Sequence, residues 1–310
     1  MKKQEEIFFP LIDKERNIYE CSELYSQNRK EVSEYYTNLI NPDYPDDKLD
    51  FTANCLTGVN SKKTIKINDN VVSFIDEPDK TNKEWERLNT QFMNYHKSLS
   101  VYTMVNSMPL INYIALKSKV GLVKNKTVVD VGGGTGHTQC SFFQNPETIE
   151  YYLVDPNLRL MHDQFIRMFP KLTYLKMGHI LAYAEKLPFV NDFADIVLSL
   201  AAVDHYKDYD LFIKDSWRIL KKGGMLFVSS HLDTPPPKED QTKIKNKLFS
   251  FSFFERLSRY IYYKKYKVGS DDHTFHFKDT SLLEESIVKA GFKIEETHVF
   301  KKNFYIIAYK

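Results

Sequence analysis

The fold is decided by the stretch Val128-Val129-Asp130-Val131-Gly132-Gly133-Gly134-Thr135-Gly136-His137. Its apolar, β-branched residues predict a short buried strand of the kind found at the centre of a parallel sheet. Three consecutive glycines then interrupt this strand, and glycine destabilises regular elements, so they need a reason. We favour a ligand that approaches the backbone closely where the next helix begins, because free N–H groups and a partial positive charge lie there. A tight turn with no ligand is the alternative.

Two classes of ligand-binding turn are relevant to this pattern. Dinucleotide folds use G-x-G-x-x-G, but the third glycine position falls on His137. The pattern present, D-x-G-x-G-x-G, resembles motif I of the class I S-adenosylmethionine-dependent methyltransferases. The resemblance implies that Asp130 helps to hold the amino group of the methionine moiety. It also implies that the cofactor lies on the glycines of the turn, which are Gly132, Gly133, Gly134 and Gly136.

Composition and charge exclude several classes of protein. The 310 residues can bury a full core, and the net charge of +2 implies no polyelectrolyte partner, so we expect no nucleic acid. The three cysteines are far apart and form no CxxC pair, so we expect neither a disulfide framework nor a metal site. The N-terminus lacks the pattern of a signal peptide, and no apolar stretch approaches the ~20 residues of a membrane span. These features predict a cytoplasmic protein.

The chain is expected to have three parts. Residues 1–80 are an accessory segment, in which Lys63–Ile67 and Val71–Ile75 alternate like the two strands of a small β hairpin. Residues 81–125 have helical periodicity and are expected to be an entry or cap region. Residues 126–310 are expected to be the S-adenosylmethionine-binding methyltransferase domain. Packing is the default role for the accessory segment, and covering the active site or binding a partner are the alternatives.

A second strand, Ile149–Val154, ends in Asp155 and Pro156. Asp155 lies about one βαβ unit after Asp130, where nucleotide-binding folds place a carboxylate that accepts hydrogen bonds from ribose hydroxyls. The resemblance assigns the same role to this second acidic motif, so both residues are expected to contact the cofactor. A solvated acid at the end of a strand is the alternative.

The stretch Ala184-Glu185-Lys186-Leu187-Pro188-Phe189 resembles the G-D-A-E-x-L-P-F loop of the family. Ala184 and Glu185 are therefore expected at the cofactor. The Gly-Asp of the family is replaced here by Ala182-Tyr183, and in relatives that Asp commonly contacts the adenine amino group. Tyr183 can stack or hydrogen-bond, but it is no charged acceptor near neutral pH. Adenine recognition is therefore expected to differ in this chain.

A fourth strand is predicted at Asp195–Leu200, and Leu200 is included among the cofactor-binding residues. The segment Ala201–His205 that follows resembles the corresponding segment of the type 11 methyltransferases. Neither N-P-P-Y or D-P-P-Y nor a Pro-Cys pair occurs there. Those motifs mark amino-group methylation and pyrimidine C5 methylation, so their absence argues against the familiar nucleic-acid base modifiers.

The stretch Trp217–Val228 resembles the R-x-L-K-P-G-G segment of the family, with Lys222 in place of the proline. It predicts a helix that ends on Gly223-Gly224, as at a glycine C-cap. A fifth strand is then expected to end near His231.

Residues 233–272 interrupt the sheet pattern and are expected to form a helical substrate lid. Between Lys238 and Lys267 nine basic residues stand against three acidic ones, around a helical stripe crowded with aromatic residues. Such a lid could also contact an anionic membrane surface, or accept an anionic or lipid-like substrate. A solvated basic face over an ordinary packed stripe is the alternative.

The C-terminal region completes the expected fold. Ser281–Ala290 predicts a helix capped by Gly291, and Phe292–Val299 and Asn303–Tyr309 predict two strands of a terminal hairpin. A plain dinucleotide fold does not need this reversed last strand. The resemblance therefore implies an α/β, Rossmann-like three-layer sandwich with a seven-stranded mixed sheet and an antiparallel last strand, plus the N-terminal extension and the helical lid.

Catalysis in this family needs few protein groups. The sulfonium of the cofactor is already an activated leaving group, so the protein mainly aligns the acceptor and excludes water. A general base can assist when the acceptor is a hydroxyl or an amine. Ligands in doubly wound sheets lie at the carboxyl ends of strands, which favours His205 and His231. The full set of candidates, each of which has a structural or exposed position as its alternative, is Asp204, His205, His231, His273 and His276.

We therefore expect an enzyme that transfers the methyl group of S-adenosylmethionine to a small-molecule or lipid-like acceptor, with the acceptor atom left open between O, N and C. The first alternative is a catalytically inactive S-adenosylmethionine-binding partner subunit, suggested by Tyr183. The second is a protein or RNA methyltransferase that uses the basic lid. A nicotinamide oxidoreductase is the weakest alternative, because the third dinucleotide glycine is missing.

Overall fold

The computed structural model describes residues 36–52, 55–68, 71–75, 110–134, 136, 138–156, 177–233, 274–300 and 302–310. The predictions made for residues 1–35, for the helices at 81–109, for the lid at 234–272 and for His273 lie outside this part of the chain.

The strands of the described residues form a single sheet in the order β1-β2-β3-β4-β7-β6-β5-β8-β9-β11-β10. Their bounds are β1 Leu49–Thr52, β2 Cys55–Gly58, β3 Thr64–Asn68, β4 Val71–Ser73, β5 Thr127–Val131, β6 Glu150–Val154, β7 Gly178–Leu181, β8 Ala194–Leu200, β9 Leu220–His231, β10 Lys293–Phe300 and β11 Asn303–Tyr309. The predicted count of seven strands is therefore wrong for the whole sheet, which has eleven in this part of the chain. The count fails because β1–β4 join the same sheet, with β4 parallel to β7.

The glycine turn follows the central strand, as predicted. β5 pairs in parallel with β6 on one side and with β8 on the other. All five of its residues are buried, in agreement with a β-branched strand covered on both faces. At the far side of the sheet β11 runs antiparallel to both β9 and β10, which confirms the predicted reversed last strand.

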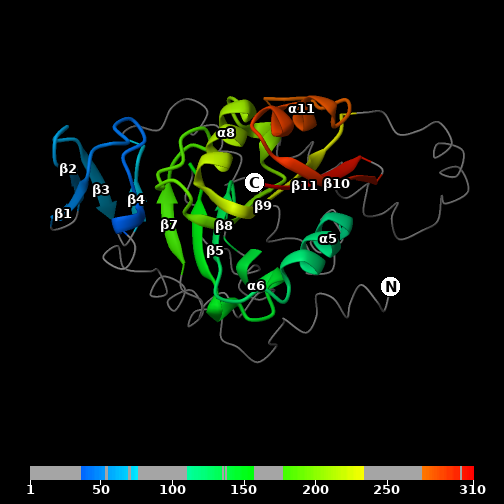
Figure 1. The fold of residues 1–310 in the computed structure, drawn as a ribbon, viewed down its shortest axis with the longest axis horizontal. Helices are drawn as coiled ribbons and strands as arrows, with labels where there is room; N and C mark the ends of the chain where they lie inside the picture. The colour runs from blue at the N-terminus through cyan, green and yellow to red at the C-terminus, as the bar shows by residue number, and fades with distance from the viewer. Residues whose placement is uncertain are drawn as a thin grey trace, which may run out of the picture.

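Helices cover both faces of the sheet and give three layers (Figure 1). Alternate residues of β5 point to opposite faces, so Val129 belongs to one hydrophobic core and Val128 to the other. The first core includes residues of α8 (Tyr209–Ile219) and α11 (Ser281–Lys289). The second includes residues of α5 (Leu110–Val120) and α6 (Thr138–Phe142). None of the described helices is long and apolar enough to cross a membrane.

The N-terminal strands continue the sheet beyond β7, at the blue end of the ribbon in Figure 1. β1, β2, β3 and β4 pair in succession as antiparallel neighbours. β3 and β4 agree to within two residues with the two strands that the sequence predicts at 63–67 and 71–75. Along β3, Ile65 and Ile67 are buried while their neighbours are exposed. These isoleucines belong to the same core as α8, so the strands pack as part of the main body.

One predicted boundary is wrong. α8 ends at Ile219 and β9 begins at Leu220, so the helix does not reach Gly223-Gly224. The two glycines instead lie within β9, where its pairing with β8 skips from Leu220 to Met225, and Gly223 has a φ of +76. The amide of Gly223 donates to the carbonyl of Lys310, and the amide of Lys310 donates to the carbonyl of Gly224. Backbone pairing with the last strand therefore takes the place of a helix cap.

Candidate functional site

The glycine turn after β5 has a backbone path that favours glycine. Gly132, Gly134 and Gly136 have φ of +71, +59 and +73, in the left-handed region where other residues cost about 1–2 kcal/mol each. A Cβ on Gly132 would lie only 2.5 Å from the Cβ of Ala202, which follows β8. The amide of Gly132 donates to the carbonyl of Val154 at 2.7 Å. The turn is thus fixed where β5, β6 and β8 end.

Asp130 lies beneath this turn and is fully buried. A Cβ on Gly133 would lie 2.4 Å from its Oδ2, which accepts a hydrogen bond from the hydroxyl of Tyr151. Burial raises the pKa of Asp130 to about 6, although hydrogen bonds from Tyr151 and Thr138 lower it; the charge of Asp155 raises it further. Its Oδ1 is buried and has no hydrogen-bond partner among the described residues. Asp130 therefore supports the turn from within the fold.

Asp155 ties the turn to β6. Its amide donates to the carbonyl of Ile180 at 3.1 Å, and its Oδ2 accepts from the amide of Gly134 at 2.9 Å. The carboxylate is buried at the carboxyl end of β6, and the half-buried Pro156 follows it. The two acids that the sequence selects, Asp130 and Asp155, thus lie on adjacent strands on two sides of the glycine turn.

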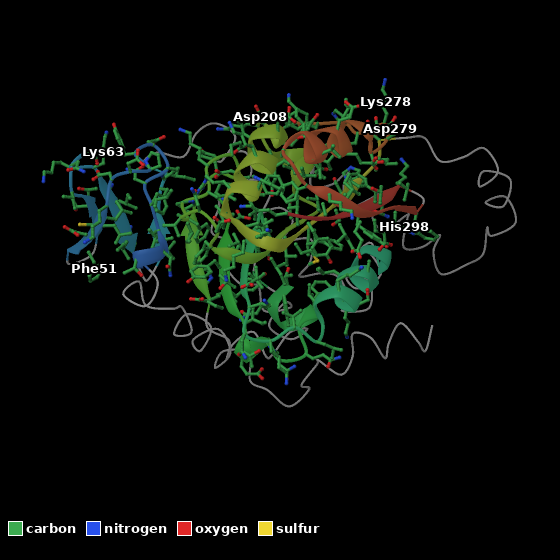
Figure 2. The ribbon with its side chains drawn as sticks, viewed as in Figure 1. Phe51, Lys63, Asp208, Lys278, Asp279 and His298 are labelled. Carbon is green, nitrogen blue, oxygen red and sulfur yellow. The ribbon has the colours of Figure 1, made fainter. Side chains whose placement is uncertain are left out.

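The loop between β7 and β8, residues 182–193, begins at the same end of the sheet and crosses to the opposite end, because β7 and β8 run in the same direction. Ala184 is buried, and Oε1 of Glu185 accepts from the amides of Lys207 and Asp208 at 2.7 and 3.2 Å. Figure 2 labels Asp208 at the start of α8, whose first turn it caps by accepting from Leu211. Nζ of Lys207 lies 4.2 Å from the ring centre of Tyr183, a cation–π distance. Tyr183 therefore contacts the segment that leads into α8.

The side chain of Arg218, in α8, holds the β7–β8 loop by bonding backbone carbonyls of the loop. Its two terminal nitrogens donate to the carbonyls of Phe189 and Leu187 at 2.6 and 2.7 Å. Its Nε donates to Asp215, which also accepts from the amide of Leu187. In the sequence, Arg218 belongs to the stretch that resembles the R-x-L-K-P-G-G segment of the family. Its bonds to the β7–β8 loop cannot be predicted from that stretch, because the loop lies about one βα unit earlier in the chain.

Tyr206 is a second residue that the sequence analysis missed. Its hydroxyl donates to the carbonyl of Val131 at 2.9 Å and lies 2.8 Å from Oγ of Ser199. Since the phenol has one proton, the serine is the donor of the second bond. Burial raises the pKa of Tyr206 well above its ordinary value, so it stays a donor. The hydroxyl of Tyr206 thus holds the carbonyl of Val131, just before Gly132. It would also lie 3.1 Å from a Cβ added at Gly132.

Two of the five catalytic candidates are brought together. β8 ends at the half-buried Leu200, and the short helix η6 (Val203–His205) follows. Oδ2 of Asp204, whose side chain is 2% exposed, lies 3.3 Å from Nδ1 of His231, whose side chain is 40% exposed at the end of β9. A carboxylate at Nδ1 holds the proton there in the neutral imidazole, which leaves Nε2 as an acceptor. Nε2 of His231 is therefore the nitrogen of this pair that can accept a hydrogen bond.

The remaining histidines are placed differently. The carbonyl of His205 accepts from the hydroxyl of Thr274 at 3.4 Å, so its backbone joins η6 to the chain that returns from the predicted lid. Nδ1 of His276 lies 3.2 Å from Asp233, and both side chains are 61% exposed. His273 lies outside the described residues.

The two ends of the predicted lid meet beside Asp204. The amide of Asp233 donates to the carbonyl of Phe277 at 2.8 Å, and the amide of Phe275 donates to the carbonyl of Asp204 at 2.9 Å. The rings of Phe275 and Phe277 pack against Tyr209. The segment that leaves the sheet at Asp233 thus rejoins it next to the Asp204–His231 pair.

Comparison with known proteins finds similarity to methyltransferases. Residues 129–228 match the sequence model of a methyltransferase domain. The chloroplastic 2-methyl-6-phytyl-1,4-hydroquinone methyltransferase of Spinacia oleracea is 31% identical over 33% of this chain and 28% of its own length. The ubiquinone biosynthesis O-methyltransferase of Pelagibacter ubique is 25% identical, over 68% of this chain and 80% of its own. A ubiquinone/menaquinone biosynthesis C-methyltransferase of Shewanella woodyi is 27% identical, over 56% and 68%. The chain thus spans less than a third of the first relative.

Proposed function

We propose, from the premise that this chain carries a class I S-adenosylmethionine-dependent methyltransferase domain, that it methylates a small-molecule or lipid-like acceptor. One observation carries the proposal: the glycine turn after β5 is tied to Asp155 at the carboxyl end of β6. In an open α/β sheet, ligands bind at the carboxyl ends of the strands beside such a turn. The cofactor supplies an electrophilic methyl group on a sulfonium when it is bound.

The residues present fit this cofactor. The glycines at 132–134 and 136 carry no side chain, so a cofactor can approach their backbone closely, and the buried Asp155 can accept hydrogen bonds from ribose hydroxyls. Oδ1 of Asp130 is a buried acceptor that an ammonium group or a bridging water can satisfy. On the adenine side the candidates are Ala184, Glu185 and the ring of Tyr183. We therefore assign these residues to cofactor binding, together with Pro156 and Leu200 at the ends of β6 and β8.

The acceptor side is assigned to the Asp204–His231 pair. Nε2 of His231 takes the proton that an O–H or N–H acceptor, or the C–H of a C-methylated carbon, releases on methylation. Asp204 then stabilises the imidazolium through Nδ1, since a buried carboxylate next to a cation is favourable. His205, His273 and His276 remain secondary candidates for this step.

Two of the three relatives are named for ubiquinone biosynthesis and one for a hydroquinone, which supports a quinone-like aromatic acceptor. The basic, aromatic segment at 233–272 supports an acceptor with a lipid tail, or contact with an anionic membrane surface. The names of the relatives include both O- and C-methylation, so the acceptor atom stays open.

The deciding experiment is calorimetric titration with S-adenosylmethionine and S-adenosylhomocysteine. The wild type should bind both. Asp155→Ala should weaken binding by roughly 10- to 100-fold, because a hydrogen bond to a charged group contributes about 1.5–3 kcal/mol. Asp50→Ala, an exposed carboxylate on β1, is the matched control and should bind like the wild type. No heat with either ligand for the wild type would reduce the proposal to a statement about the fold.

A second candidate function is a cofactor-binding partner subunit without turnover. The contact between Tyr183 and Lys207 favours this second function. The ring of Tyr183 is engaged by a cation at the position where the family resemblance gives an Asp that accepts from the adenine amino group. Incubation with labelled S-adenosylmethionine and a metabolite extract separates the two functions. Label in an organic-soluble product identifies an enzyme, while cofactor binding without labelled product supports the subunit.

A further inference from the structure

We infer that the N-terminal strands position the β7–β8 loop, so that Leu39 and Ile40 are positioning residues for cofactor binding. The term N-terminal module is used here for residues 36–75, which contain η3 (Tyr36–Asn38) and β1–β4. The inference concerns the loop itself, and its consequence for affinity rests on the proposed function. Two separate contacts between the module and the loop carry it.

The first contact lies where the loop begins. β4 pairs in parallel with β7, from Val71 opposite His179 to Ser73 opposite Leu181. The amide of Phe74 donates to the carbonyl of Leu181 at 2.8 Å. Leu181 is the last residue of β7, so the pairing continues up to the start of the loop. Without the module β7 would be an edge strand with unpaired N–H and C=O groups on one side.

The second contact lies further along the loop. The amide of Ile40 donates to the carbonyl of Pro188, and the amide of Val190 donates to the carbonyl of Asn38, both at 3.1 Å. Leu39 pairs with Phe189 in an antiparallel bridge between these two bonds. The side chain of Leu39 is 3% exposed and that of Phe189 is fully buried. The module thus adds a short backbone pairing to the loop and covers it with an apolar side chain.

These contacts complement those made by α8. Arg218 binds the carbonyls of Leu187 and Phe189, and Ile40 binds the carbonyl of Pro188 that lies between them. Three successive carbonyls of the loop are therefore held, alternately by the methyltransferase domain and by the module. Backbone groups that are bonded on both sides leave the loop few conformations, so little order has to be gained when a ligand binds.

The loop is connected to the proposed cofactor site at its near end. Asp155 donates its amide to Ile180 of β7, one residue before Leu181. Glu185 bonds the amides of Lys207 and Asp208, and these follow η6. A shift of the loop would therefore move Ala184 and Glu185 relative to Asp155. The module can change the geometry of the site without touching the cofactor.

The ion pair between Asp43 and Lys186 provides a matched control. It also joins the module to the loop, at 2.5 Å, but both side chains are more than 60% exposed. Exposed pairs of this kind contribute little, because solvent screens them. The inference therefore predicts that the buried contact at Leu39 matters and that the exposed contact at Asp43 does not. Leu39 and Asp43 lie in the same module and contact the same loop. Comparing them therefore tests whether the buried contact in particular positions the loop.

The experiment compares Leu39→Ala, Leu39→Met and Asp43→Ala in the full chain. Hydrogen–deuterium exchange is followed in peptides covering 182–193 and, as an internal reference, in peptides from β8 and β9. In Leu39→Ala the amides of the loop, including those of Leu187, Phe189 and Val190, should exchange faster while the reference peptides do not change. Leu39→Met should restore protection, and Asp43→Ala should match the wild type.

Calorimetry with S-adenosylhomocysteine then tests the functional consequence. Leu39→Ala should raise the Kd about tenfold, since ordering a loosened loop costs on the order of one or two immobilised side chains. Faster exchange confined to β1–β4, with the loop and the Kd unchanged, would overturn the inference. If Leu39→Ala does not fold, Leu39→Val replaces it. The loop amides should then exchange faster and the Kd should rise, each by less than expected for Leu39→Ala. If the wild type binds no S-adenosylhomocysteine, the proposed function fails, and the exchange of the loop alone decides the inference.

Discussion

Asp130 gives the sharpest test of the electrostatics beneath the glycine turn. Burial raises its pKa from 3.8 to about 6, so the folded protein holds this proton more tightly than the unfolded chain does. The free energy of unfolding should therefore fall as pH rises from about 4 to about 6, and this contribution should be constant above that window. A rise of about two pKa units corresponds to about 3 kcal/mol, at about 1.4 kcal/mol for each unit.

The perturbation is Asp130→Asn, which keeps the shape and an acceptor oxygen but removes the ionisable group. Denaturant unfolding is measured from pH 4 to pH 8 for both proteins, and the difference in free energy isolates this one site. The wild type should lose about 3 kcal/mol relative to Asp130→Asn across the window. Tyr151→Phe removes a hydrogen bond that lowers the pKa, so its window should extend above pH 6. Parallel profiles for wild type and Asp130→Asn would refute the reasoning.

Three further substitutions test the supports of the fold. Tyr206→Phe removes the donor to the carbonyl before the glycine turn, and should lower the free energy of unfolding by about 1–3 kcal/mol in denaturant titration; an unchanged midpoint would contradict this. Gly132→Ala adds a methyl group 2.5 Å from Ala202 at φ +71, and should cost at least about 1–2 kcal/mol while weakening S-adenosylhomocysteine binding in calorimetry. Gly291→Ala meets the ring of Trp217 at 3.0 Å with φ +107, and should lower the melting temperature without changing cofactor affinity, because it lies at the end of the sheet where β9 begins; a matching loss of affinity would argue against that separation.

Local sequence patterns predict the centre of the sheet well. The β-branched run before Gly132 has one physical interpretation, a buried strand followed by a turn, and β5 matches it. The terminal hairpin is also predicted, since β10 and β11 are adjacent in sequence and β11 carries a continuous apolar run. β7 is not predicted, because Gly178–Leu181 is only four residues long and carries no clear periodicity.

Contacts between distant segments are the part that the sequence could not predict. The pairing of β4 with β7 leaves no local pattern, so the sequence predicts an accessory segment at residues 1–80 and not an extension of the sheet. Asp204 and His231 could be selected because both lie near strand ends, but their contact depends on β8 and β9 being neighbours. The roles of Arg218 and Tyr206 likewise depend on loops folded against them.

The parallel pairing of β4 with β7 has a consequence for how the chain is made. Val71 pairs with His179, 108 positions later, so β4 leaves the ribosome well before its partner exists. At ~5–20 residues per second, translation takes roughly 5–20 s to reach β7. β1–β4 can form their antiparallel pairs early, because these are local, but the outer side of β4 stays open during this interval. The nascent chain is therefore exposed to misassociation at this strand until β7 is made, and co-expressed chaperones that cover open strand edges should raise the soluble yield.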